Sequence, residues 1–186
     1  MFKIRFRPLL RQDLPLLGSW LAAPHVARWW QEPSDHRSVE TNYLPLIDGQ
    51  DSTQVFVIEL DREAVGIIQL WRLGDCTEWA DYQAVLEDPQ NAAGIDFLLG
   101  EVKHVGKGIG SQAIRDFVSL VFECYPEIDA VVADPEQANV QSWRALEKVG
   151  FERIWAGEVA NSSGPSFLYR YSRWKEQRAK GSPKLN

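Results

Sequence analysis

The segment at residues 94–110 constrains the fold more than any other part of this chain. Its sequence, GIDFLLGEVKHVGKGIG, changes from an apolar run to a glycine-rich turn within a few residues. The apolar run predicts an interior strand made of Ile95, Phe97, Leu98, Leu99 and Val102. From Ser111 onward the apolar residues recur with the period of an amphipathic helix. We therefore expect a buried strand, a glycine turn and a helix in direct succession.

The glycines at positions 106, 108 and 110 leave backbone N–H groups uncovered by side chains. A helix that begins in such a turn can hold an anion on its free N–H groups. The turn is not a Walker loop, because Gly108 stands where Ser or Thr should hold magnesium, and Ser111 occupies the place of the third glycine of a dinucleotide-binding loop. The sequence thus indicates another kind of phosphate site, although glycines that serve only tight packing remain an alternative.

A second strand and helix follow the glycine turn and its helix. The β-branched segment 128–133 predicts a strand that Asp134-Pro135 ends. Asn139 then begins a helix, and Gly150 has the position of its C-terminal cap. One face of this helix carries Val140, Trp143, Leu146 and Val149.

This succession of elements resembles the GCN5-related N-acetyltransferases over roughly residues 4–172. The glycine turn is similar to their motif A, which holds the pyrophosphate of acetyl-coenzyme A, although Val105 replaces the usual Arg or Gln. Residues 128–151 are similar to motif B, whose Asn and helix lie along the pantetheine arm. The resemblance implies acetyl-coenzyme A as co-substrate, no metal, and an α/β fold with a mixed, mostly antiparallel, splayed sheet. The cofactor-binding residues that it implies are Leu98, Leu99, Val105, Gly106, Lys107, Gly108, Ile109, Gly110, Ser111 and Asn139.

The remaining segments predict further strands and helices around this centre. Strands are expected at residues 3–7, 55–60, 64–71, 151–157 and 166–172. Helices are expected after Asp13 as a cap, over His25 to Trp30, and from Ser38 to about Tyr43. Mixed strands with helices on both faces of the sheet make an α/β fold.

We expect one domain over residues 1–173 and a basic, poorly ordered tail at 174–186. No apolar run reaches the length of about 18 residues that a membrane span needs, and the N-terminus lacks a signal-peptide cleavage site. Cys76 and Cys124 form no disulfide framework, and the three histidines are too scattered for a zinc site. The sequence therefore favours a cytoplasmic enzyme domain without a metal, as a monomer or a homodimer.

The segment between Asp75 and Glu101 is acidic and contains no Lys or Arg. Its acids are Asp75, Glu78, Asp81, Glu87, Asp88, Asp96 and Glu101, and Trp79 and Tyr82 lie among them. Carboxylates and aromatic rings together attract cations, so we expect a cleft for a cationic small molecule. The net charge of −6 argues against a nucleic-acid partner. A solvated acidic loop is the alternative.

Several short pieces narrow the resemblance to the aminoglycoside 6′-N-acetyltransferases. They are HVARWW (25–30), NYLP (42–45), GID (94–96), VGKGIG (105–110), DP (134–135) and EKVGFER (147–153). The resemblance implies that Asp96 binds the amino sugar and acts as the base, and that Asp134 makes a second carboxylate contact. It implies that Trp29, Trp30 and Tyr43 line the sugar site, and it places Trp79, Asp81 and Tyr82 in a loop beside that site.

Asp96 is the candidate base for a second reason, because a charged residue within an apolar strand is costly without a function or a polar partner. A purely structural partner for this carboxylate is the alternative. We expect a strand bulge near Leu98 to Gly100 to free an N–H group that polarises the thioester carbonyl. Leu146 replaces the Tyr that many family members use to protonate the leaving thiolate. The proton donor is then water, another residue such as Tyr169, or absent.

Three other functions remain open from the sequence. One is a siderophore acyltransferase with a hydroxylated lysine as acceptor, which the acidic segment disfavours. The second is an N-terminal protein acetyltransferase, suggested by SWRALEKVGF. The third is an acetyl-coenzyme A sensor or binding module without catalysis, in which Asp96 would be dispensable.

Overall fold

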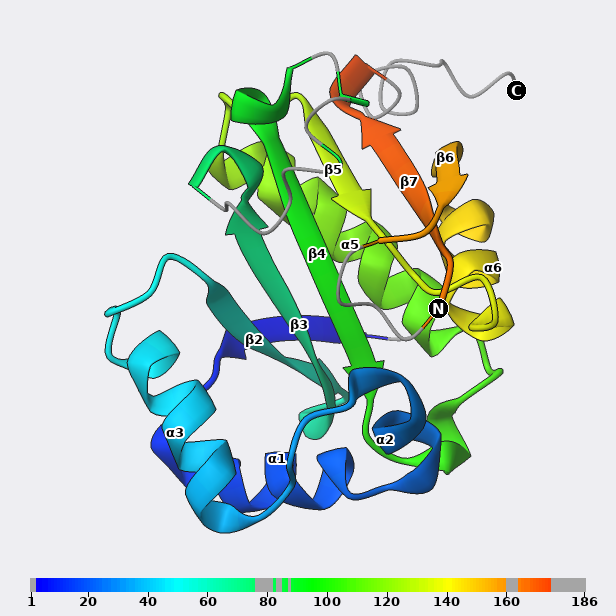
Figure 1. Cartoon of the computed structure of the whole chain (residues 1–186). Helices are drawn as coiled ribbons and strands as arrows, with labels where there is room; N and C mark the ends of the chain where they lie inside the picture. The colour runs from blue at the N-terminus through cyan, green and yellow to red at the C-terminus, as the bar shows by residue number, and fades with distance from the viewer. Residues whose placement is uncertain (1–2, 76–81, 83–84, 87, 160–163, 175–186) are drawn as a thin grey trace, which may run out of the picture.

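The computed structural model describes residues 3–75, 82, 85–86, 88–159 and 164–174, and these form a seven-stranded sheet (Figure 1). The strands are β1 Ile4–Pro8, β2 Gln54–Leu60, β3 Glu63–Arg72, β4 Ala92–Leu99, β5 Ala130–Ala133, β6 Glu152–Gly157 and β7 Ser166–Ser172. Their order is β1-β2-β3-β4-β5-β7-β6, and neighbours are antiparallel except for the parallel pair β4 and β5. The predicted mixed, mostly antiparallel sheet is confirmed.

Helices cover both faces of this sheet, as the sequence predicts. They are α1 Leu14–Leu21, α2 Pro24–Trp30, α3 His36–Ile47, α5 Ile109–Cys124 and α6 Val140–Val149. Successive strand residues point to opposite faces. Val57 and Ile67 therefore pack with α1, α2 and α3, whereas Ile58 and Ile68 pack with α5 and α6.

The two helices after the glycine turn form as their sequences predict. In α5 the apolar face is fully buried, and Phe117 makes edge-on contacts with Phe6 and Phe56 at 5.0 and 5.3 Å between ring centroids. At the start of α6 the Asn139 side chain accepts a hydrogen bond from the N–H of Ser142 at 3.2 Å. The helix ends at Gly150, which has a φ of 109°.

Three details of the predicted elements are wrong. Asp13 precedes α1, but its carboxylate accepts from the Leu10 N–H and pairs with Arg7, so it does not cap the helix. Val102 is 70% exposed, because β4 ends at Leu99 and the chain then enters a short 3-10 turn. The third helix is longer than expected, since Asp35 caps it by accepting from the Ser38 N–H and its last turn reaches Ile47.

The strands β4 and β5 diverge in the middle of the sheet. They pair only from Ala92 to Gly94 on β4, so no strand of the described residues lies beside the rest of that edge of β4. On the other edge of β4, the pairing with β3 runs from Ala93 to Leu99 without a shift in register. The predicted bulge is therefore wrong, and the splay of the sheet exposes the edge of β4 instead.

Among the described residues, no helix combines the length and the apolar character that crossing a membrane requires.

Candidate active site

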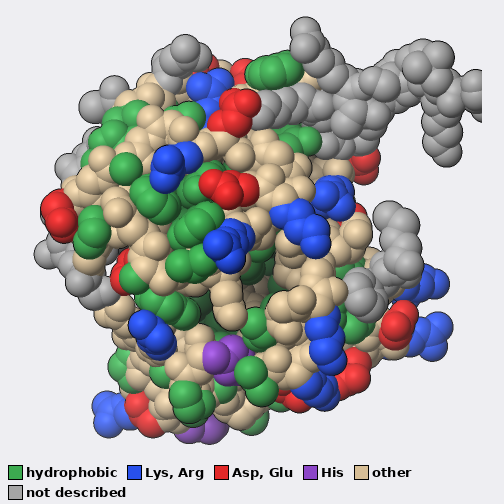
Figure 2. All heavy atoms as spheres, turned by 90° about the vertical axis from the view of Figure 1, so that its right-hand side faces the viewer, with side chains coloured by type: hydrophobic (Ala, Val, Ile, Leu, Met, Phe, Trp, Pro, Cys, Tyr) green, Lys and Arg blue, Asp and Glu red, His purple; other side chains and the backbone are tan. Residues whose placement is uncertain are grey.

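Two adjoining cavities lie where β4 and β5 diverge. The larger, of about 480 Å³, is lined by Gly106, Gly108 and Gly110, and we call it the glycine-turn cavity. The smaller, of about 260 Å³, is lined by Asp96, Asp134 and Glu136, and we call it the carboxylate cavity. Five residues line both cavities: Trp29, Trp30, Phe97, Asn139 and Ser142. Figure 2 shows the hollow on this face, with Lys and Arg side chains around it.

The glycine turn has the geometry of an anion cradle. Gly106 and Gly108 have φ values of 74° and 83°, which side chains other than glycine rarely adopt. Gly108 is the N-cap of the 16-residue α5. The free N–H groups in the first turn of this helix therefore lie beside the glycine-turn cavity, which Gly108 and Gly110 line. Apart from the adjacent residues of the chain, no atom of the described residues lies within 4 Å of the position of a Cβ at Gly106, and the nearest such atom at Gly108 is the Lys148 Nζ, at 3.8 Å. The turn thus offers bare amides and an ammonium group to a phosphate.

Most of the residues expected to bind the cofactor surround this cavity. The lining includes Leu98, Leu99, Val105, Gly106, Gly108, Gly110, Ser111 and Asn139. Ile109 differs, because its side chain is 2% exposed and packs in the core, so only its backbone can take part. Lys107 is exposed and is not part of the lining.

His25 contributes a contact that the sequence did not identify. Its Nε2 lies 3.0 Å from the carbonyl oxygen of Leu99, at the free edge of β4, and its ring lines the glycine-turn cavity. This contact links the start of helix α2 to the end of strand β4. The only signal in the sequence is that His25 begins the HVARWW segment.

The side chain of Asp96 lines the carboxylate cavity. Its side chain is exposed there and lies on the same face of β4 as Leu98. The prediction of a carboxylate buried within the strand is therefore wrong in part, since the strand places it at the cavity surface. The surrounding protein displaces water from the carboxylate and raises its pKa above the ordinary value of 3.8, and the nearby charge of Glu32 raises it further.

Asp134 is the second carboxylate of this cavity. Burial raises its pKa, the charge of Asp96 adds to the effect, and the hydrogen bond from Tyr82 opposes it. The Tyr82 hydroxyl donates to Asp134 Oδ2 at 3.1 Å, and its ring packs edge-on against Trp155. Tyr82 thus holds Asp134 rather than lining the cavity. Two interacting carboxylates of this kind titrate as a pair.

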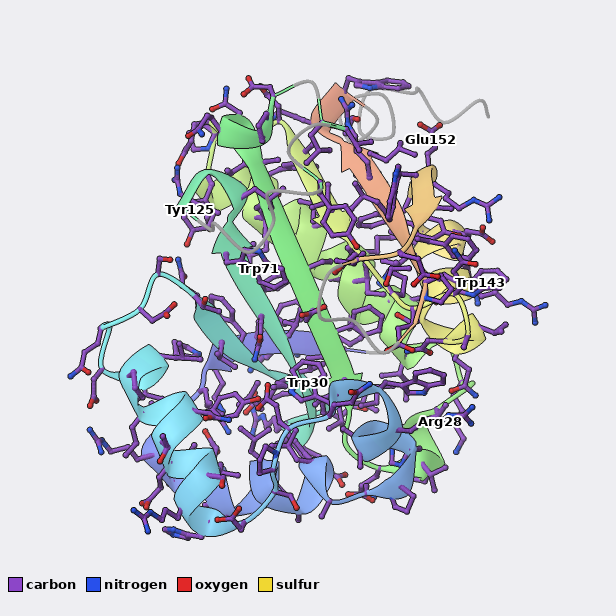
Figure 3. All side chains as sticks on the ribbon, viewed as in Figure 1. Arg28, Trp30, Trp71, Tyr125, Trp143 and Glu152 are labelled. Carbon is purple, nitrogen blue, oxygen red and sulfur yellow. The ribbon has the colours of Figure 1, made fainter. Side chains whose placement is uncertain are left out.

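The two tryptophans of α2 lie at the junction of the cavities, and Trp30 lies beside the end of β4 (Figure 3). The Trp30 Nε1–H donates to Glu32 Oε1 at 2.9 Å and to the Tyr43 hydroxyl at 3.2 Å. Tyr43 is 1% exposed and lines neither cavity, which corrects the prediction that it contacts the sugar. Its burial raises the pKa of the phenol, so Tyr43 stays neutral and orients Trp30.

Glu32 is a fourth carboxylate beside the site, and the sequence did not identify it. Its Oε2 is buried and has no hydrogen-bond partner among the described residues. It follows Gln31, which ends α2 in the left-handed conformation with a φ of 54°. No periodicity or motif marks this residue, because the turn after α2 alone brings it near Asp96.

The acidic segment of residues 75–101 is described only in part. Trp79, Asp81, Glu78 and Glu87 lie outside the described residues, as does the side chain of Asp75. Of the described acids, Asp96 lines the carboxylate cavity, whereas Asp88 accepts from the Asn91 side chain and Glu101 pairs with Lys103. The acidity of the described cavity comes mainly from Asp134, Glu136 and Glu32, on other segments.

Comparison with known proteins decides the family of this chain. A family model described as an acetyltransferase (GNAT) domain matches residues 10–159. The chain belongs to the GNAT acetyltransferases. Aminoglycoside N(6′)-acetyltransferase type 1 of Klebsiella pneumoniae is 30% identical to this GNAT protein over 181 residues, which are 95% of this chain and 87% of the relative. A kanamycin resistance protein of Rhizobium radiobacter is 33% identical over 94 residues, which are 50% of this chain and 84% of that protein.

A solved structure gives the same result for the whole fold of this GNAT chain. The crystal structure of AAC(6′)-Ib in complex with coenzyme A and kanamycin has a TM-score of 0.84 and 29% sequence identity, and the match covers 96% of this chain and 100% of the other. The chain is therefore an acyltransferase that uses acetyl-coenzyme A, as predicted. The glycine-turn cavity fits this co-substrate, since bare amides, Lys148 and Arg144 meet there with an apolar lining from α2 and β4.

Proposed function

We propose that this protein transfers the acetyl group of acetyl-coenzyme A to an amine of an aminoglycoside, specifically the 6′-amine. The observation that carries this proposal is that a cavity lined by bare glycine amides adjoins a cavity lined by carboxylates, since five residues line both. The similarity to an aminoglycoside N(6′)-acetyltransferase over 95% of the chain supports the choice of acceptor and of position.

The carboxylate cavity suits an acceptor with several ammonium groups. Asp96, Asp134 and Glu136 line it, and Glu32 lies close enough for its charge to act on Asp96. Their mutual repulsion makes a set of negative charges costly without a partner, so a polycation relieves it on binding. The rings of Trp29 and Trp30 offer flat surfaces for the sugar.

Asp96 acts as the base in this proposal. An ammonium group must lose a proton before its nitrogen can attack, and a carboxylate whose pKa is raised is better matched to that task near neutral pH. Bound acetyl-coenzyme A supplies the acetyl group as a thioester. The unpaired edge of β4 beyond Gly94 supplies N–H groups that can polarise its carbonyl oxygen. The contact between His25 and Leu99 holds this edge in place.

The test is a thiol-release assay with acetyl-coenzyme A and a panel of acceptors. The panel contains kanamycin and ribostamycin, a polyamine, hydroxylysine and a peptide with a free N-terminus. We expect the highest kcat/KM with an aminoglycoside, and mass spectrometry with NMR should locate the acetyl group on the 6′-nitrogen. A clear preference for hydroxylysine or for the peptide would replace this proposal with one of the other acyltransferase functions, and no release with any acceptor would contradict it.

A further inference from the structure

The active site lacks a tyrosine at the place where the acetyl group is transferred. All five tyrosines of the chain are described, and none of them lines the glycine-turn cavity or the carboxylate cavity. Leu146 is fully buried in the core. The Tyr169 hydroxyl donates to Glu147 at 2.8 Å, and burial and this partner raise the pKa of the phenol to about 12. Tyr169 is therefore not the proton donor that the sequence left open.

The junction of the two cavities limits the groups that can contact the sulfur of coenzyme A. The donor occupies one cavity and the acceptor the other, so transfer takes place beside the residues that line both. Of these five, Phe97 has no polar side-chain atom, the Trp30 N–H is already engaged, and the Trp29 ring offers an N–H but no hydroxyl. The Oδ1 of Asn139 caps α6. Ser142 carries the one hydroxyl in this set.

Ser142 has a side chain that is free to act. Its backbone N–H bonds to Asn139, but its hydroxyl has no hydrogen-bond partner in the described part of the chain. It lies in the first turn of α6, one helical turn before Leu146 and on the same side of the helix. The Ser142 hydroxyl can thus reach the junction of the two cavities from α6. The corresponding helix carries a tyrosine in many other acetyltransferases.

We propose that the Ser142 hydroxyl donates a hydrogen bond to the sulfur of coenzyme A as it leaves. The ammonium group of the acceptor first gives one proton to Asp96, and the neutral nitrogen then forms the new bond to the acetyl carbon. The second proton of this nitrogen passes to water as the tetrahedral intermediate collapses, and Asp96 later returns its proton to water. The electron pair of the carbon–sulfur bond leaves with the sulfur as a thiolate. Ser142 keeps its own proton, because an alcohol is a much weaker acid than a thiol, and the thiolate takes its proton from water. This inference rests on acetyl transfer to an amine and not on which amine is used.

The test measures the pKa of the coenzyme A thiol in its complex with the enzyme, from the ultraviolet absorbance of the thiolate, without any acceptor. A hydrogen bond to a charged acceptor is strong enough that Ser142→Ala should raise this pKa by about one pH unit and lower kcat about tenfold. Ser142→Thr should keep the wild-type thiol pKa, whereas Ser142→Val, which has the same shape without the hydroxyl, should behave like alanine. As a control, Ser19→Ala removes an exposed hydroxyl on α1 that lines neither cavity, and it should leave the thiol pKa unchanged.

The comparison isolates the hydroxyl because the ionisable groups around the site stay the same in every variant. These are Asp96, Asp134, Glu136, Glu32, His25, Arg144 and Lys148. Equal thiol pKa values for the threonine and valine variants would overturn the proposal, even if the alanine variant did not fold. A difference between them would support it even if no aminoglycoside were acetylated, so the two proposals can fail separately.

Discussion

The charge of Glu32 should raise the pH at which this enzyme loses activity in acid, by raising the pKa of Asp96. Glu32 accepts from the Trp30 N–H through Oε1, while its buried Oε2 has no partner among the described residues. Its charge acts on Asp96, the proposed base. Glu32→Gln keeps the size of the side chain and an oxygen for Trp30 while it removes the charge.

The size of the effect follows from the causes that act on Asp96. Loss of water around the carboxylate is the larger cause and the Glu32 charge the smaller, and together they raise the pKa of Asp96 from 3.8 to about 6. Removing the smaller cause should lower this pKa by no more than about one pH unit, and screening by water in the cavity reduces the expected change to roughly half a unit. A base must be unprotonated to act, so activity falls as the pH drops through its pKa. The acid limb of the profile should therefore move to lower pH in the variant.

The measurement is kcat/KM against pH for the wild type, Glu32→Gln and Glu136→Gln with one aminoglycoside. Titration of the free substrate is the same for all three, so differences between the profiles report the enzyme. Glu136 lines the same cavity but is not among the causes of the raised pKa of Asp96, so its variant should keep the acid limb in place. A limb that stays in place in Glu32→Gln, or moves to higher pH, would refute this reasoning.

Three further changes test other parts of the structure. Asp96→Asn should lower kcat at least about tenfold, because general-base catalysis contributes about 10²–10⁴-fold, and a variant with wild-type turnover would leave Asp96 as a binding residue only. Gly108→Val should weaken acetyl-coenzyme A binding in calorimetry at least about tenfold, because a β-branched side chain at a φ of 83° distorts the cradle. Gly49→Ala is its control, since Gly49 also has a positive φ but lines neither cavity, and equal loss of binding in both variants would contradict the cradle. Phe117→Ala should lower the free energy of unfolding by about 3–5 kcal/mol in urea titrations, because Phe117 fills the core between α5 and the sheet, whereas Val102→Ala at an exposed position should change it by no more than about 0.5 kcal/mol.

The parts of this fold that the sequence predicted depend on local rules. The glycine turn, the Asn139 cap and the Gly150 stop are set by the conformations that single residues allow, and the strands follow their apolar patterns. Asp13 shows the limit of this reasoning, because a nearby Arg7 outcompetes the helix N–H groups for its carboxylate.

The parts that the sequence did not predict depend on contacts between distant segments. His25 reaches Leu99 across 74 positions of the chain, and Glu32 acts on Asp96 only because α2 folds back over β4. The resemblance predicts that Tyr43 lies near Trp30, and the two side chains do share a hydrogen bond. The packing of the core, however, buries Tyr43 behind the tryptophan and keeps it out of the cavity. No local pattern distinguishes these two positions.

The segment Gly94-Ile95-Asp96 explains why the cavities open where they do. Gly94 pairs across the sheet with Trp71, whose ring lies on the glycine so closely that a Cβ would collide with it, and Figure 3 shows Trp71 on β3 beside β4. Gly94 is also the last residue of β4 that pairs with β5. Ile95 then enters the core, and Asp96 turns to the opposite face, into the space that the diverging strands leave. One tripeptide thus packs the sheet, marks the point of its splay and presents the proposed base, which is why the site follows directly from the fold.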